Sequence, residues 1–367
     1  MSRAPGSRGF AFPGGLQLLS WLGLAISLTT LALSSPKLIE EGGGGWMVLG
    51  NLAQYGWTIA LLAVVFAGTR TIGLRALAGA ALAGFFGVSS LAVLVGKPFV
   101  EKLGQQSELV MTVVAPVSEE LLKLMPVAAF LLFAVRSRHF RPSIGDVVLF
   151  GTTVACGMSM YENILYARGT DGGWFQNLPF SPALPFLHVQ GPMLVGGHVV
   201  YTALTSLGVA ITVFYGSRVR LAKLAFPVTL AVAIFEHSTV DRLVLIGADD
   251  LGWFARLSVL ITLHGYLSTG LLVSGIAAVS VYEHRVIARG GGELPASLGV
   301  RDMIGGFASS SRWEGLLRLR KRVRYEYLRR SSIFAAEQTA QSAPDAATIA
   351  SVRAMFRGAE LSSGVAA

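Results

Sequence analysis

Charged residues are scarce in this sequence. Asp, Glu, Lys and Arg make up 14% of its 367 residues, against about 25% in a typical soluble domain. Hydrophobic residue types reach 53%, and the mean hydropathy is +0.59. This balance excludes both a water-soluble globular protein and a disordered chain. It predicts a polytopic membrane protein of the all-α class.

Cysteine is almost absent, since Cys156 is the single example. One cysteine excludes an internal disulfide framework and any multi-cysteine zinc or iron–sulfur site. The His-Glu-x-x-His helix of zinc proteases, the Gly-x-Ser-x-Gly turn of serine hydrolases and the Walker A loop of ATP-driven pumps are also missing. The net charge of +9 does not indicate nucleic-acid binding, because the basic residues do not share one face.

Long apolar runs dominate the chain. A helix needs about 20 apolar residues to cross a hydrocarbon layer about 30 Å thick. Eight runs qualify, namely 16–34, 46–68, 76–96, 108–135, 145–167, 193–215, 222–247 and 255–282. Arg and Lys gather in alternate connections and in the tail from Arg285 onward. The positive-inside rule therefore predicts a multi-pass protein of the cell membrane with both termini cytoplasmic.

Ionisable residues inside the predicted spans are informative, because each costs about 2.5–3.5 kcal/mol at the centre of a membrane helix. The fourth span holds Glu119, Glu120 and Lys123. The spacing lets the ammonium of Lys123 neutralise either carboxylate. Two adjacent carboxylates in a low dielectric cannot both ionise cheaply, so we expect one to hold a proton or bind a partner. A buried ion pair that only fixes helix packing is the plainer alternative.

The next three spans carry further polar and ionisable residues, which are Glu162, Asn163, His198, His237 and Asp241. His237 and Asp241 share one helical face, so Asp241 can accept a hydrogen bond from the imidazole and fix its tautomer. At about 1.5 Å per helical residue, the ionisable residues fall in the outer half of the bilayer. We expect them to converge on one hydrated cavity that opens to the outside.

The order and spacing of these residues resemble the PrsW family of intramembrane proteases, distant relatives of the CAAX prenyl endopeptidases. The motifs are Glu119-Glu120-Leu121-Leu122-Lys123, Met158-x-x-x-Glu162-Asn163, His198 and His237-x-x-x-Asp241. The resemblance covers about residues 105–245. It departs from the CAAX proteases at Asp241, where those relatives carry Asn.

The resemblance implies an intramembrane endopeptidase that cleaves a single-span membrane protein near the extracytoplasmic side. An anti-sigma factor is the substrate associated with the founding member of the family. In this hypothesis Glu119 or Glu120 is the general base that activates a water, helped by Glu162 or His198. Lys123 tunes the carboxylate pair.

His237, oriented by Asp241, would stabilise the oxyanion or protonate the leaving amine. Asn163 has a supporting role. Family members have also been classed as metalloproteases, and zinc takes three protein ligands and a water in catalytic sites. His198, His237 and Glu162 are the predicted ligands if zinc is used. A carboxylate-activated water without a metal stays an equal alternative.

Two other functions fit the same residues. Intramembrane Glu and His clusters also serve proton- or ion-coupled transporters and channels, which is the main alternative, although the sequence contains no inverted repeat to support it. An inactive scaffold could instead bind a partner helix through small residues such as Gly79-x-x-x-Ala83.

This interpretation divides the chain into three parts. Residues 1–104 form an N-terminal three-helix membrane segment, 105–284 the membrane catalytic core, and 285–367 a basic cytoplasmic tail that is partly disordered. Within the tail, 312–330 is typical of a helix lying on anionic lipid, with a solvated helix as the alternative. The predicted partners are thus a single-span substrate and anionic lipid, and the sequence does not indicate an oligomeric state.

Overall fold

The computed structural model describes residues 44–104, 107–136, 141–166, 188–190, 193–246 and 253–290, together with a few residues between 327 and 338. The first predicted span, 16–34, lies outside the described residues. So does most of the tail, including residues 312–326 of its predicted lipid-bound helix.

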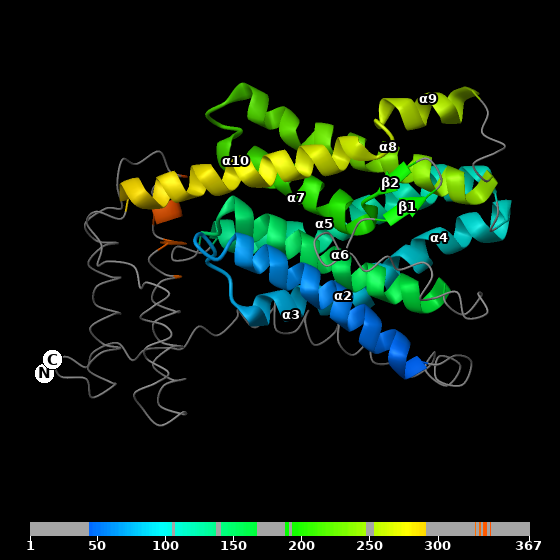
Figure 1. The fold of residues 1–367 in the computed structure, drawn as a ribbon, viewed down its shortest axis with the longest axis horizontal. Coiled ribbons are helices and arrows are strands. Elements are labelled where there is room, and N and C mark those ends of the chain that lie inside the picture. Colours follow the sequence, from blue (N-terminus) through cyan, green and yellow to red (C-terminus); the bar gives the residue numbers. More distant parts are fainter. Residues whose placement is uncertain are drawn as a thin grey trace, which may run out of the picture.

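The described chain is helical apart from one short hairpin (Figure 1). Its α-helices are α2 (Gly44–Val65), α3 (Leu74–Leu82), α4 (Ser89–Leu103), α5 (Ala115–Arg136), α6 (Ile144–Tyr166), α7 (Gly197–Tyr215), α8 (Ala225–Ile246), α9 (Trp253–Ile261) and α10 (Tyr266–Gly290). The π-helical segments Ala83–Val88 and Val110–Val114 precede α4 and α5, and the 3-10 segment Arg220–Leu224 precedes α8. The strands β1 (His188–Gln190) and β2 (Met193–Val195) pair in antiparallel fashion.

Five helical stretches are long and apolar enough to cross a membrane, which are Leu74–Leu103, Ile144–Ile164, Gly197–Tyr215, Arg220–Leu245 and Arg256–Arg289. They coincide with five of the predicted spans. The predicted spans 46–68 and 108–135 coincide with α2 and α5, and α5 carries Glu119, Glu120 and Lys123. The total of eight spans and the cytoplasmic side of both termini stay predictions.

The last of these stretches is interrupted. Between α9 and α10, Leu263, His264 and Gly265 adopt positive φ angles of 51°, 54° and 83°. Positive φ is disfavoured for residues with a Cβ atom, so contacts with other parts of the chain must stabilise this turn. Glu236 of α8 supplies such contacts, because its carboxylate accepts hydrogen bonds from the backbone N–H (3.2 Å) and the hydroxyl (2.6 Å) of Ser268. Hydropathy could not reveal this turn, since most of the residues around it are apolar.

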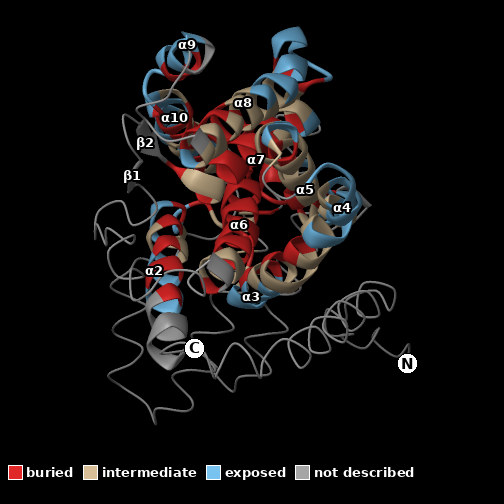
Figure 2. Ribbon diagram, turned by 90° about the vertical axis from the view of Figure 1, so that its right-hand side faces the viewer, coloured by how far each residue is buried: buried red, intermediate tan, exposed pale blue. Residues whose placement is uncertain are grey.

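The centre of the bundle is formed by α6 and α7, which are buried along most of their length (Figure 2). They pack against each other, while α2, α3 and α5 lie against α6, and α8 and α10 lie against α7. Leu149 and Leu204 belong to the shared apolar core. The two helices that bring Glu162 and His198 into the structure are thus shielded from lipid by the others.

The backbone of α6 touches those of α3 and of the π-helical segment after it at two glycines. A Cβ atom at Gly84 would overlap the carbonyl oxygen of Val154, and one at Gly157 would overlap that of Ala81. Such close approach is what small residues permit between membrane helices. Gly79, which the sequence suggested for a partner-binding face, has no neighbour within 4 Å of an added Cβ.

The described residues of the tail contact the end of the bundle at which α6 begins. The guanidinium of Arg330 donates to the carbonyl oxygen of Ala67 at 2.7 Å. The hydroxyl of Ser331 accepts from the backbone N–H of Arg141 at 2.6 Å, and Phe334 is buried. This part of the tail therefore packs on protein.

We expect Gly84→Ala and Gly157→Ala to lower the free energy of unfolding by about 1–3 kcal/mol each, because the added methyl group meets backbone that cannot turn away. Gly79→Ala is the matched control and should leave stability within about 0.5 kcal/mol. Unfolding of the purified protein in a denaturing detergent titration measures all three. Equal midpoints for Gly84→Ala and Gly79→Ala would contradict the close contact.

Candidate functional site

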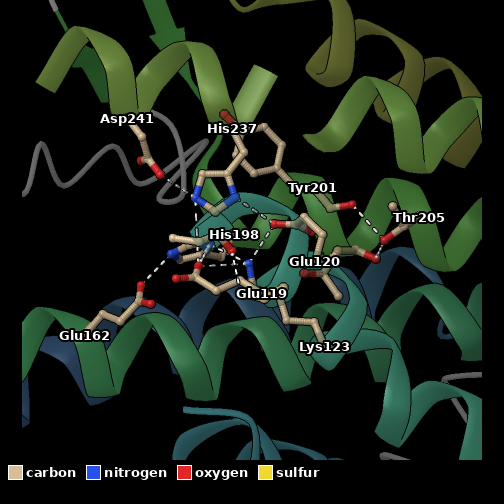
Figure 3. A network of polar contacts seen from close by, with 12 residues as sticks. Glu119, Glu120, Lys123, Glu162, His198, Tyr201, Thr205, His237 and Asp241 are labelled. Carbon is tan, nitrogen blue, oxygen red and sulfur yellow. Dashed lines mark hydrogen bonds and ion pairs between the residues drawn. The ribbon is translucent and has the colours of Figure 1, made fainter. Parts of the chain in front are cut away.

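Four helices send ionisable side chains to one cluster (Figure 3). Its members are Glu119, Glu120 and Lys123 from α5, Glu162 from α6, His198 from α7, and His237 and Asp241 from α8. The structure thus brings together all the predicted site residues except Asn163. The side chain of Asn163 instead donates to Asn51 (2.9 Å) and to Tyr55 (2.9 Å), and so ties α6 to α2.

The start of α5 places its two carboxylates. The backbone N–H of Ala115 bonds to the carbonyl oxygen of Val110, one residue further back than in an α-helix. Pro116, which follows, has no N–H to donate, so the regular hydrogen-bond ladder is interrupted here. Wide turns of this kind are frequent at functional sites. Glu119 and Glu120 follow in the first turns of the regular helix.

Lys123 is the buried centre of the cluster. Its ammonium lies 2.7 Å from Oε1 of Glu120 and 2.6 Å from Nδ1 of His198, and 3.9 Å from Oε2 of Glu119. The side chains of Lys123 and Glu120 are both 0% exposed. A buried charge must be paired and hydrogen-bonded, so this lysine fixes α5 against α7.

The two ring nitrogens of His198 have different partners. Nε2 contacts Oε2 of Glu162. A carboxylate only accepts hydrogen bonds, so Nε2 carries the proton and donates to Glu162. Nδ1 then keeps its lone pair, which faces Lys123 and lies 3.9 Å from Glu119. Glu162 thereby sets the tautomer of His198.

His237 is held in the same manner by Glu120. Its Nδ1 lies 3.1 Å from Oε1 of Glu120, and its ring stacks on Tyr201 with centroids 5.5 Å apart. Its Nε2 faces Glu119 at 3.9 Å and Asp241 at 3.5 Å. The sequence predicted Asp241 as the orienting carboxylate, whereas the shorter contact is made by Glu120. Tyr201 was not predicted, although it lies one helical turn after His198.

Glu119, His198 and His237 form a candidate metal centre, since one ligand atom of each lies within 4.8 Å of the others. Oε2 of Glu119 is 3.9 Å from Nδ1 of His198 and from Nε2 of His237. Ligands of a tetrahedral zinc ion lie about 3.4 Å apart, so each of these two separations would have to shorten by about 0.5 Å. The far nitrogen of each imidazole contacts a carboxylate, as in histidines that bind zinc.

The candidate metal centre differs from the predicted ligand set in one member. Glu162 was the expected carboxylate ligand, but it contacts the Nε2 atom of His198 that points away from the other two ligands. Glu119 takes its place in the cluster. Because Nδ1 of His198 accepts a hydrogen bond from Lys123 here, an ion could bind there only if the ammonium turned toward Glu120.

The cluster has a closed side and an accessible side. Glu120 and Lys123 are fully buried, whereas the side chains of Glu119, Glu162 and Asp241 are 18%, 15% and 23% exposed. Glu119 therefore lies on the accessible side of the cluster, and Glu120 on the closed side.

A comparison with protein families matches residues 73–267 to a family described as PrsW family intramembrane metalloprotease. The chain belongs to the PrsW family. The match spans more than half of the 367 residues and includes every residue of the cluster. It confirms the resemblance seen in the motifs, and with the apolar helices it confirms a multi-pass membrane protein. Comparisons with curated proteins and with solved structures gave no match.

We expect Lys123→Met to lower the stability of this PrsW-family protein by about 3–5 kcal/mol, because it leaves the carboxylate of Glu120 buried without a cation. Adding Glu120→Gln should recover much of that loss. Lys97→Met is the control, since Lys97 pairs with Glu101 at the surface, and its effect should stay below about 1 kcal/mol. Detergent-induced unfolding measures the stability of each variant. A Lys123→Met protein as stable as the wild type would show that the buried Glu120 carboxylate does not depend on this cation.

Proposed function

We propose that this PrsW-family member hydrolyses a peptide bond of a single-span membrane protein near the extracytoplasmic side. The observation that carries the proposal is the convergence of Glu119, His198 and His237 from three helices, with the far nitrogens of both imidazoles on carboxylates. Following the family resemblance, an anti-sigma factor is the substrate we propose first. Anionic lipid remains the proposed partner of the basic tail.

Glu119 is the proposed reactive carboxylate. It is partly exposed, whereas Glu120 is buried and already bonded to Lys123 and His237. In a metal-free reaction Glu119 takes the proton of the attacking water. The Nε2 atom of His237 lies beside it and can donate to the developing oxyanion or to the leaving amine.

If zinc is used, Glu119, His198 and His237 would hold it. The bound ion would supply a Lewis acid and a water that is easily deprotonated. Glu120 and Glu162 would then orient the two imidazoles through the nitrogens that face away from the ion. Glu162 and Asp241 are the accessible carboxylates left to accept a proton.

In the metal-free version Asp241 acts through His237. An ionised carboxylate cannot donate a hydrogen bond to an oxyanion, so Asp241 would need to be protonated to do so; the role we propose for it is to orient His237. At 3.5 Å from Nε2, the Asp241 carboxylate stabilises the protonated imidazole, which is the form of His237 that can donate to the oxyanion or to the leaving amine.

A proton-conducting path is less well supported. Among the described residues, the buried carboxylates Asp146 and Glu283 lie near the other end of α6, and Asp146 accepts from Thr71, Ile72 and Ser143. The intervening part of α6 includes the fully buried Leu149 and Val154. A relay would need ionisable groups or water along that stretch.

The test is cleavage of a single-span substrate in liposomes. Glu119→Gln and His237→Ala should lower the rate by about 100-fold or more, because each removes a group that moves a proton or holds the ion. Glu101→Gln is the control, since Glu101 is an exposed carboxylate on the neighbouring helix, and it should cleave at the wild-type rate. Undiminished cleavage by both site variants would exclude the proposal.

Metal dependence is measured in the same preparation. A chelator that abolishes cleavage, with recovery on adding Zn²⁺, selects the zinc version. Zinc content then separates ligands from other residues: His198→Ala should lose the ion, whereas Glu101→Gln should retain it. Cleavage that persists in chelator, in protein free of zinc, selects the carboxylate-activated water.

A further inference from the structure

An apolar groove lies at the end of the bundle at which α6 begins and at which α7 and α10 end (Figure 1). Its volume is about 270 Å³. It is lined by Ile144 of α6, by Ile211 and Tyr215 of α7, and by Ala278, Val279 and Tyr282 of α10. The groove is open on one side, since Ala278 is exposed. It is separate from the ionisable cluster, which lies at the opposite end of α6.

The polarity of the groove changes in steps along its length. Its aliphatic part includes Ala278, one helical turn deeper in the bundle than Tyr282. The rings of Tyr215 and Tyr282 come next and meet edge to face, with centroids 5.8 Å apart. Arg218 follows, because its backbone N–H donates to the carbonyl oxygen of Tyr215. Arg285 lies one turn beyond Tyr282 on the same face of α10. The order is therefore aliphatic, phenolic and cationic.

The cations at this end have no protein partner to neutralise them. Arg218, Arg285 and Arg289 are exposed, and no carboxylate of the described chain pairs with any of them. The described residues of the tail cover a neighbouring face of α10, where Val286 packs with Phe334. Arg285 is still exposed beside that contact. The arginines next to the groove are therefore available to an anion.

We propose that the groove binds one anionic phospholipid. One acyl chain lies against Ile211 and Ala278, and the phosphate accepts hydrogen bonds from Arg218 and Arg285. The steps in polarity match those of a phospholipid from chain to headgroup, and tyrosine is enriched at the level where the two regions meet. Basic pockets between membrane helices bind anionic headgroups in the same way. The site requires neither the proposed hydrolysis nor the basic tail.

Lipid selectivity tests the cationic part of the site. Native mass spectrometry of the full chain in detergent should show phosphatidylglycerol retained at lower concentrations than phosphatidylcholine. Arg218→Gln and Arg285→Gln should each weaken phosphatidylglycerol binding about fivefold, because each removes one cation near the headgroup. Arg285→Lys keeps the charge and should retain most of the affinity. Arg75→Gln is the control, since Arg75 is an exposed cation on α3 outside the groove.

A substitution within the groove tests the aliphatic part. Phosphatidylglycerol should raise the unfolding midpoint of the wild type, because a ligand that binds only the folded protein stabilises it. Ala278→Trp fills the groove, leaves every arginine in place and should abolish this rise. Ala277→Trp is the matched control, since Ala277 is exposed but does not line the groove, and it should keep the rise.

Three results would overturn the proposal, and none of them depends on cleavage. Equal retention of the two lipids by the wild type would show that the groove does not recognise the headgroup. Equal losses from Arg75→Gln and Arg285→Gln would show a diffuse attraction without a site. Undiminished stabilisation of Ala278→Trp by phosphatidylglycerol would show that the lipid binds elsewhere on the protein.

Discussion

The buried ammonium of Lys123 is the constraint on which the site depends. A lysine with no solvent contact requires partners in fixed positions, and here they come from its own helix and from α7. Glu120, held by that lysine, extends the connection to His237 on α8. The charge of Lys123 thus determines how α5, α7 and α8 pack against one another. The imidazoles are placed by this network before any ion or substrate arrives, which is the preorganisation that catalysis requires.

Neighbouring carboxylates have different roles because their surroundings differ. Glu120 is enclosed and satisfied by Lys123 and His237, so it orients other groups. Glu119 has no bonded partner as close as these and borders the accessible side, so it remains available for chemistry. Adjacent positions on a helix point about 100° apart. That difference turns the side chain of Glu120 toward the core and that of Glu119 toward the accessible side of the cluster.

Helical spacing and the cost of charge in a membrane were sufficient to predict which acidic, basic and histidine side chains gather at the site, but not that Asn163 lies apart from it or that Tyr201 packs on His237. They could not predict which helix each side chain meets. Glu120 and His237 are 117 residues apart, and only the packing of α5 against α8 brings them together. The link from Asn163 to α2 and the grouping of Glu119, in place of Glu162, with the two histidines have the same origin. The turn at Leu263 was invisible because hydropathy averages over the residues that form it.

Consecutive residues of α8 hold that helix from two sides. Glu236 bonds to Ser268 at the start of α10, while His237 bonds to Glu120 on α5. A rotation of α8 about its own axis would break one of these contacts. The orientation of the His237 imidazole is therefore coupled to the tight turn before α10. A lipid or protein that shifts α9 could therefore alter the reactive ring without approaching it.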